Sequence, residues 1–285
     1  MPHSDTTGGS GAELRLLVVL AHPDDETLAT GGLLARCAAE GVPTYLVTAT
    51  HGQSGRYHDL RPGEPGHPGL EGLAAIRERE LFAATKVLGV REVNLLGYVD
   101  GRLDQADPVE VIDRIAAHVR RIRPHVVVTF AQDGGYGHPD HIAICQFATA
   151  ACVRAADPAH APTGLAPWAV AKLYYMAWSA GAMAAYQEAF KTLTTKVDGV
   201  ERAAHPWPEW ALTTVVDTRA YWPTVWKAVL CHDSQVANYA KLKDLSPENH
   251  EGLWGRSTLY RVFSTVNGGR KQEVDVFEGL RPSGA

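Results

Sequence analysis

The sequence predicts an α/β fold, a Rossmann-like arrangement of three layers with a mostly parallel sheet and a C-terminal elaboration. Segments typical of buried strands alternate with segments typical of helices through the N-terminal half of the 285 residues. The strand segments are nearly continuous apolar runs, which is the pattern expected when helices cover both faces of a parallel sheet. Their alternating order implies that right-handed crossovers connect the strands.

Each element of the N-terminal half has a local signal. Strands are predicted at the short apolar runs Leu14–Leu20, Pro43–Thr50, Val93–Leu96 and His125–Phe130. Helices are predicted at Thr27–Glu40, Gly72–Leu88, Pro108 to about Arg121, and Pro139–Ala155. Gly41 and Gly89 end the first two helices, and Asp107 caps the third.

The pattern changes after about Asp157, where Trp, Tyr and Pro become frequent. Further strands are predicted at Leu173–Trp178 and Leu212–Val216, and a helix at Tyr221–Leu230. The aromatic residues of this half are expected to form packed core and rim; a sugar-stacking wall is the alternative. We expect residues 13–285 to form one domain, preceded by a polar, Gly- and Ser-rich leader at residues 1–12 that is disordered.

Composition excludes several classes of partner. The net charge of −5 gives no general attraction to nucleic acid or to anionic lipid. No window approaches the roughly 18 apolar residues of a membrane span. The four cysteines form no CxxC pair, and a reduced, cytoplasmic setting fits them best. The expected partner is a small molecule, and a homo-oligomeric state stays open.

The most informative stretch is His22-Pro23-Asp24-Asp25-Glu26, directly after the first strand. In an open α/β sheet, ligands bind outside the carboxyl ends of the strands. Adjacent acids at such a point repel one another and lose water, and a divalent cation relieves that cost. An acidic helix N-terminus is the alternative, and it explains the three acids but not the histidine.

A second motif follows the strand His125–Phe130 and ends in the sequence Gly137-His138-Pro139-Asp140-His141. Two such strand ends can lie side by side, which would bring His22, Asp25 and His141 within reach of one ion. Two imidazoles, one carboxylate and an open position suit a catalytic zinc.

The residues left over within the two motifs have candidate catalytic roles. Asp24 can accept a proton from a metal-bound water and act as general base. His138 is a candidate acid or oxyanion stabiliser, and Tyr136 can place its hydroxyl on a developing oxyanion. The Gly- and Pro-rich stretch from His51 to Leu70 has no periodicity and is expected to be a functional loop.

These residues resemble the LmbE/PIG-L family of zinc-dependent de-N-acetylases over most of the chain, from about Leu14 to Val236. Besides the two motifs, the resemblance includes Thr50-His51-Gly52, Arg77 with Glu80, and His232-Asp233-Ser234-Gln235. It implies an LmbE-like fold, one zinc ion per chain bound by His22, Asp25 and His141, Asp24 as base, and supporting roles for Tyr136 and His138. It also implies that Arg56 and Asp100 contact the substrate sugar.

Other residues that belong to the resemblance are expected to have structural roles. Arg77 and Glu80 are expected to pair with each other, and the loop histidines His51, His58 and His67 to face solvent. The similarity looks closest to the actinobacterial branch that processes N-acetylglucosaminyl inositol.

The sequence therefore predicts a zinc-dependent hydrolase that removes the N-acetyl group from an N-acetylglucosamine-type sugar or its conjugate. Two alternatives remain at this point. One is an amidase that cleaves a larger acyl or cysteinyl group from a glucosaminyl conjugate. The other is a non-catalytic sugar-binding module, although no GxGxxG fingerprint supports dinucleotide binding.

Overall fold

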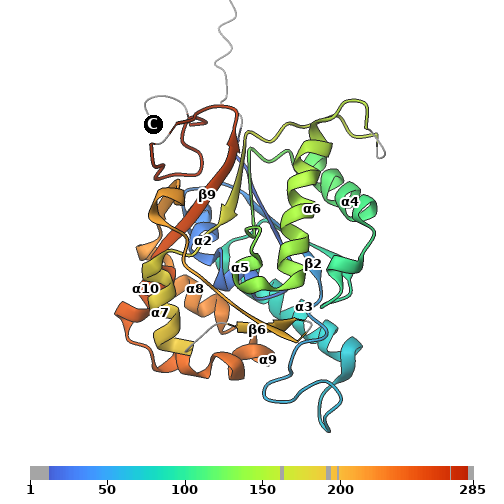
Figure 1. Cartoon of the computed structure of the whole chain (residues 1–285), viewed down its shortest axis with the longest axis vertical. Coiled ribbons are helices and arrows are strands. Elements are labelled where there is room, and N and C mark those ends of the chain that lie inside the picture. Colours follow the sequence, from blue (N-terminus) through green and yellow to red (C-terminus); the bar gives the residue numbers. More distant parts are fainter. Residues whose placement is uncertain (1–12, 161–163, 191–193, 198, 270, 282–285) are drawn as a thin grey trace, which may run out of the picture.

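A sheet with strand order β3-β2-β1-β4-β5-β9-β8 forms the centre of the molecule (Figure 1). The computed structural model describes residues 13–160, 164–190, 194–197, 199–269 and 271–281, so the predicted leader at residues 1–12 lies outside the described residues. The strands of this sheet are β1 (Leu16–Leu20), β2 (Thr44–Thr50), β3 (Glu92–Tyr98), β4 (Val126–Thr129), β5 (Lys172–Met176), β8 (Thr214–Asp217) and β9 (Arg256–Ser264).

The sheet confirms the predicted α/β class. The strands β1 to β5 run parallel, whereas β9 is antiparallel to both β5 and β8. The strand β1 is buried along its whole length, and β2 and β4 beside it are buried too. Because β8 and β9 continue the sheet of the N-terminal half, we propose that residues 13–285 form a single domain.

Helices cover both faces of the sheet. One group consists of α4 (Pro108–Ile122) and α6 (Pro139–Ala156), which pack on each other. The other contains α2 (Gly31–Ala39), α3 (Gly69–Leu88) and α8 (Trp222–Val229), which also contact one another. The remaining helices are short or belong to the C-terminal half: α1 (Asp25–Leu28), α5 (Gly134–Gly137), α7 (Ala180–Phe190), α9 (Asp233–Val236) and α10 (Pro247–Trp254).

The helix predicted at Thr27–Glu40 is wrong in detail, because the structure breaks it into α1 and α2. Thr30 lies between them with φ −125° and ψ 1°. Its hydroxyl donates a hydrogen bond of 3.0 Å to the carbonyl of Glu26, four residues back. A threonine side chain that bonds to this carbonyl competes with the backbone amide that would continue the helix.

The C-terminal half contains elements that the sequence did not predict. The strand β9, the helices α7 and α10, and the hairpin of β6 (Thr194–Val197) and β7 (Val200–Ala203) are all additional. Aromatic residues of α8 and α10 form a second core, in which Trp222, Trp226 and Trp254 pack around His250. Trp222 and Trp226 therefore form packed core, as predicted, whereas Trp178 lines the cavity and Trp210 is exposed.

The loop between β2 and α3 is held by the C-terminal part of the chain. Within it, the structure shows one short bridge, between Tyr57 and Leu60, and no helix or strand. The side-chain amide of Gln235 donates to the carbonyl of Arg56 at 2.8 Å, and the amide of His58 donates to the carbonyl of Ser234 at 2.7 Å. The loop is thereby anchored beside the carboxyl end of β2.

A buried carboxylate ties the last described segment to the sheet. Glu273 accepts hydrogen bonds from Lys172 at 2.6 Å, Tyr174 at 2.6 Å and Thr214 at 2.7 Å, and its side chain is 1% exposed. Asn267 donates a further bond to the same carboxylate. These contacts connect residues of β5 and β8 with the chain that follows β9.

We expect this carboxylate to make the fold acid-sensitive. Burial raises the pKa of Glu273, but its hydrogen bonds from Lys172, Tyr174 and Thr214 outweigh that effect and lower the pKa from 4.5 to about 2. The stabilisation is therefore complete above about pH 4.5 and is lost as the pH falls towards 2. Urea unfolding between pH 2 and 7 measures this slope, and Glu273→Gln should make it shallower; an equally steep slope in that variant contradicts the assignment.

Candidate metal and catalytic site

The two predicted motifs lie at the point where the strand order of the sheet reverses. Connections from β1 lead to β2 on one side, and β4 lies on the other side. His22 follows β1 by two residues, and His141 belongs to the first turn of α6, which follows β4. This topological switch point is where open α/β sheets bind their ligands.

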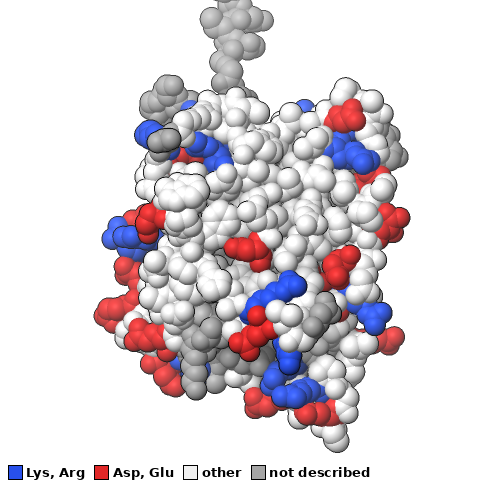
Figure 2. Space-filling model, viewed as in Figure 1, with Lys and Arg blue, Asp and Glu red and all other residues white. Residues whose placement is uncertain are grey.

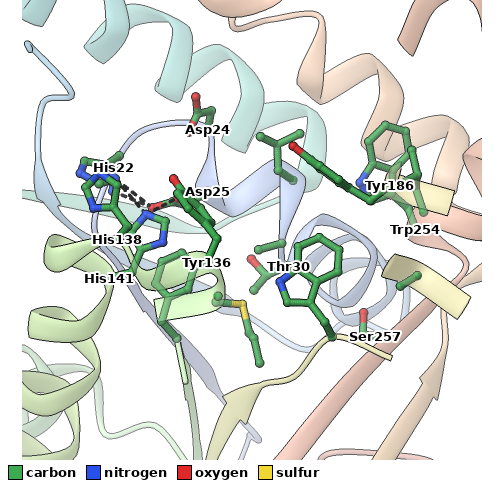
Figure 3. A pocket seen from close by; sticks show the side chains of 18 of the residues that line it. His22, Asp24, Asp25, Thr30, Tyr136, His138, His141, Tyr186, Trp254 and Ser257 are labelled. Atoms are coloured by element: carbon green, nitrogen blue, oxygen red, sulfur yellow. Dashed lines mark hydrogen bonds and ion pairs between the residues drawn. The ribbon is translucent and has the colours of Figure 1, made fainter. Parts of the chain in front are cut away.

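Three side chains from these motifs converge on one point (Figure 3). His22 Nδ1 lies 3.2 Å from His141 Nε2 and 3.6 Å from Asp25 Oδ2, while Asp25 Oδ1 lies 3.6 Å from His141 Nε2. All three residues are buried. Ligands around a tetrahedral zinc ion, at bond lengths of about 2.0–2.2 Å, are separated by roughly 3.3–3.6 Å. The spacing fits a metal ion between them.

Hydrogen bonds to one nitrogen of His22 and one nitrogen of His141 orient the two rings so that their other nitrogens face each other. His141 Nδ1 lies 3.1 Å from the carbonyl of Gly134, which can only accept, so this nitrogen carries the proton. His22 Nε2 lies 3.1 Å from carboxylate oxygens of Asp140 and Asp100 and donates in the same way. His22 Nδ1 and His141 Nε2 therefore face each other across 3.2 Å, and both can bind a metal once the proton between them is lost. Such outer partners are typical of metal-binding histidines.

The electrostatics of the cluster favour a positive charge at this point. Burial lowers the pKa of His22, but its bonds with Asp100, Asp140 and Asp25 outweigh burial and raise that pKa well above 6.5. Burial lowers the pKa of His141 to about 3. Burial opposes ionisation of Asp25, yet the two histidines lower its pKa to about 2, so Asp25 is a carboxylate. A cation held here compensates the surrounding carboxylates.

His138 offers a further nitrogen near the same point. One ring nitrogen each of His138, His22 and His141 lie within 4.8 Å of one another. The ring of His138 also stacks on that of His141, with 4.6 Å between the ring centroids. Nδ1 of His138 accepts from the amide of Asp140 at 3.2 Å and so caps α6. Burial and the neighbouring His22 lower the pKa of His138, which is therefore neutral near pH 7.

Asp24 lies beside the cluster and is held by an arginine. Arg77 Nη2 is 3.0 Å from Asp24 Oδ2 and also donates to the carbonyl of Pro23, while Nη1 donates to the carbonyl of Gly52 at 2.8 Å. The predicted pairing of Arg77 with Glu80 is wrong: the carboxylate of Glu80 accepts from the amide and hydroxyl of Ser234 at 2.6 and 2.7 Å. Sequence spacing put both residues on one helix but gave no sign of these partners.

Tyr136 lines the same pocket from the other motif (Figure 3). It follows Gly134 and Gly135, whose positive φ values of 62° and 75° allow the sharp turn before α6. Burial, with the nearby charges of Asp25 and Asp24, raises the pKa of Tyr136, so its hydroxyl stays protonated and can donate a hydrogen bond.

The two predicted sugar contacts lie in different surroundings. Asp100 lines the pocket, where its carboxylate contacts His22 and accepts from the amide of Ser54 at 2.9 Å. The Arg56 side chain is exposed, and Arg56 is not among the described residues that line the pocket. Both roles stay predictions.

The loop histidines are half-buried instead of solvent-facing, since His51 lies 3.5 Å from Glu78 and His67 contacts the carbonyl of Gly55.

The site opens into a cavity of about 400 Å³. Its polar end carries the motif residues, and its far wall is largely apolar and comes from α1, α2, β5, α7, α10 and β9, with Leu28, Leu33, Met176, Trp178, Leu253 and Trp254. A mostly apolar pocket with a few convergent polar groups is typical of small-molecule sites.

One face of the molecule carries charges of both signs (Figure 2). On the face shown in Figure 2, acidic and basic side chains are interspersed, and no continuous basic patch covers it. Among the described residues, no helix combines the length and the apolar character needed to span a membrane.

Gly52 provides a test of the Arg77 contact. A Cβ atom there would lie 2.1 Å from Arg77 Nη1, so Gly52→Ala should push the guanidinium away from Asp24 and lower kcat. Gly63→Ala is the matched control, because Gly63 also has a positive φ but no atom within 4 Å of the added Cβ. Both variants should lose about 1–2 kcal/mol from backbone strain. Kinetics and urea unfolding separate the effects, and equal kcat values in the two variants contradict the prediction.

The fold and this cluster define a Rossmann-like protein with a candidate metal site at the carboxyl ends of its parallel strands. A family model described as "PIG-L: GlcNAc-PI de-N-acetylase" matches residues 17–152. The chain belongs to this family, because it also has relatives that are 35% identical to it over 94% of its length.

Two of these relatives are named 1D-myo-inositol 2-acetamido-2-deoxy-alpha-D-glucopyranoside deacetylase. The protein from Kineococcus radiotolerans is 35% identical over 94% of this chain and 84% of its own length. The protein from Streptomyces avermitilis is 35% identical over 94% of this chain and 98% of its own. The solved structure of the 4-carboxy-2-hydroxymuconate hydratase GalB from Pseudomonas putida KT2440 has a TM-score of 0.67 at 20% identity and covers 90% of this chain and 99% of that one. This last similarity concerns the fold alone.

Proposed function

We propose that this chain hydrolyses the N-acetyl amide of an N-acetylglucosamine-type sugar conjugate and that zinc is its resident metal. The observation that carries the proposal is the convergence of His22 Nδ1, His141 Nε2 and the Asp25 carboxylate, three groups that can each bind a metal, on one buried point. Relatives named as deacetylases of an amino-sugar glycoside support the reaction. They do not favour the alternatives of an amidase for larger acyl groups or a non-catalytic binding module.

The metal would be held by His22, Asp25 and His141. When bound, zinc supplies a water of lowered pKa and polarises the amide carbonyl. Asp25 is oriented for this role because its Oδ2 accepts from the backbone amide of His22 at 2.8 Å. Asp100 and Asp140 act through His22, whose Nε2 proton they bind, and so fix the direction of its Nδ1 lone pair.

The remaining polar groups of the pocket divide the proton chemistry. Asp24 accepts the proton of the attacking water at its carboxylate and then delivers it to the nitrogen of the leaving amine, with Arg77 fixing the orientation of that carboxylate. Tyr136 donates its hydroxyl to the oxyanion that develops on the amide carbonyl. His138 is neutral and lies against His22 and His141, where its imidazole can bind the same oxyanion.

The sugar would bind at the polar end of the cavity, where Asp100 lines the wall and Arg56 lies in the neighbouring loop. The inositol glycoside named for the relatives is one member of this substrate class. We also propose a cytoplasmic location, since Cys37, Cys145, Cys152 and Cys231 are all free thiols.

Metal analysis coupled to an acetate-release screen tests the proposal. Protein purified without chelator should contain about one zinc ion per chain and release acetate from N-acetylglucosaminides, including the inositol glycoside. N-propionyl and cysteinyl glucosaminides serve as controls for a larger acyl group. Preferential cleavage of the cysteinyl amide, or protein that neither contains nor binds metal, would overturn the proposal.

A further inference from the structure

A fully buried ion pair joins the first motif to a segment 206 residues further along the chain. Glu26 Oε1 lies 2.6 Å from His232 Nε2, and both side chains are 0% exposed. The second oxygen of this carboxylate, Oε2, accepts a hydrogen bond of 2.9 Å from the backbone amide of Asp24. The pair therefore contacts the backbone of the proposed base directly.

The backbone of Asp24 has an uncommon conformation. Its φ of 93° and ψ of −27° lie in the left-handed region, which is sterically unfavourable for a residue with a side chain. Both of its peptide groups are engaged: the amide donates to Glu26, and the carbonyl accepts from the amides of Thr27 and Leu28 and from the Thr27 hydroxyl. The surroundings thus determine the direction in which the Asp24 side chain leaves the chain.

The segment that supplies His232 also binds other walls of the site. Its residue Ser234 donates to Glu80 on α3, and Gln235 donates to the carbonyl of Arg56 and lines the pocket. The contact between His232 and Glu26 therefore links the C-terminal part of the chain to the backbone of the proposed base.

We propose that Glu26, oriented by His232, is a positioning residue that holds Asp24 in its left-handed conformation and so aims the general base. The inference rests on the proposed catalytic role of Asp24. A helix-capping role alone explains neither the burial nor the partner, because a carboxylate at a helix N-terminus is stabilised when exposed. Burying a carboxylate is unfavourable unless it is paired, and here the pair lies beside the site.

Two substitutions of Glu26 separate the effect of its carboxylate position from the effect of its charge. Glu26→Asp keeps the charge but shortens the side chain by one methylene, which withdraws the carboxylate from the Asp24 amide. Glu26→Gln keeps an oxygen at the original reach but removes the charge. We expect Glu26→Asp to lower kcat by about 10–100-fold with KM nearly unchanged, and Glu26→Gln to lower it by less than about 5-fold, because small misplacements of catalytic groups are costly.

Ser234→Ala is the matched control, since it removes the hydroxyl bond to Glu80 from the same segment, keeps the backbone bond to Glu80 and does not touch Glu26. It should lower Tm while leaving kcat within about 2-fold of the parent. Glu26→Asp, in contrast, should lower kcat because it misplaces Asp24. Both Glu26 variants should bind one metal ion per chain as the parent does.

Amide hydrogen exchange of metal-free protein gives a readout that does not depend on activity. The Asp24 amide should exchange faster in Glu26→Asp than in the parent or in Glu26→Gln. The reverse kinetic order, with Glu26→Gln the more impaired, overturns the proposal, as does unchanged exchange at Asp24. If Asp24 proves dispensable for catalysis, the exchange result still reports on the contact, so the two hypotheses fail separately.

Discussion

Asp24→Asn is expected to lower kcat by about 10²–10⁴-fold, the range that general bases contribute. Asparagine has the size and shape of aspartate, and its amide oxygen can keep the bond to Arg77 that the carboxylate makes at 3.0 Å. The variant therefore loses basicity and little else. Metal content should not change, because the converging ligands are His22, Asp25 and His141.

Acetate release under saturating substrate, together with metal analysis of the same sample, measures this effect. Asp244→Asn is a suitable control, since Asp244 is exposed and does not line the cavity. Activity of Asp24→Asn within a few-fold of the parent would rule out Asp24 as the base. A parallel loss of metal and activity would instead place Asp24 among the ligands.

His141→Ala is the second change with a large expected effect, because it removes one of three ligands from a buried site. Changing even the partners of ligands typically costs 10–100-fold in metal affinity, so we expect a loss of more than about 100-fold here. His141 also stacks on Phe130 at 3.8 Å between centroids, and its removal leaves a cavity in the core. Deacetylation should fall with the metal content.

Titration with zinc, followed by the shift in Tm on metal addition, separates the loss of affinity from the loss of packing. The parent should gain stability with metal and His141→Ala should gain little, because only a folded site binds the ion. His67→Ala, in the loop beside Gly55, is the control and should respond as the parent does. An undiminished Tm shift in His141→Ala contradicts the assigned ligand.

The sequence alone predicted those features of the structure that depend on the local pattern of residues. Apolar runs predicted the parallel strands, and polar residues directly after two of them predicted which side chains converge, because parallel strands present their carboxyl ends at one edge. The strand β9 was missed because most of its residues are only partly buried and polar residues interrupt its apolar ones, so it lacks the continuous apolar run of the parallel strands.

Contacts between distant segments could not be predicted in the same way. Arg77 binds Asp24 across 53 residues, and His232 binds Glu26 across 206. The resemblance singled out both Arg77 and the segment His232-Asp233-Ser234-Gln235, but spacing along the chain does not say which partner each meets. Thr30 shows a local limit as well: its own side chain competes for the carbonyl that a continuous helix requires.

The place of β9 in the sheet has a consequence for biosynthesis. Ribosomes deliver a chain from its N-terminus, and the proposed metal ligands end at His141. The strand β9, inserted between β5 and β8, brings Ser257 and Leu259 to the cavity wall more than a hundred residues later. During translation every proposed ligand therefore emerges before the part of the cavity wall that β9 supplies, so this part of the pocket is the last to be completed.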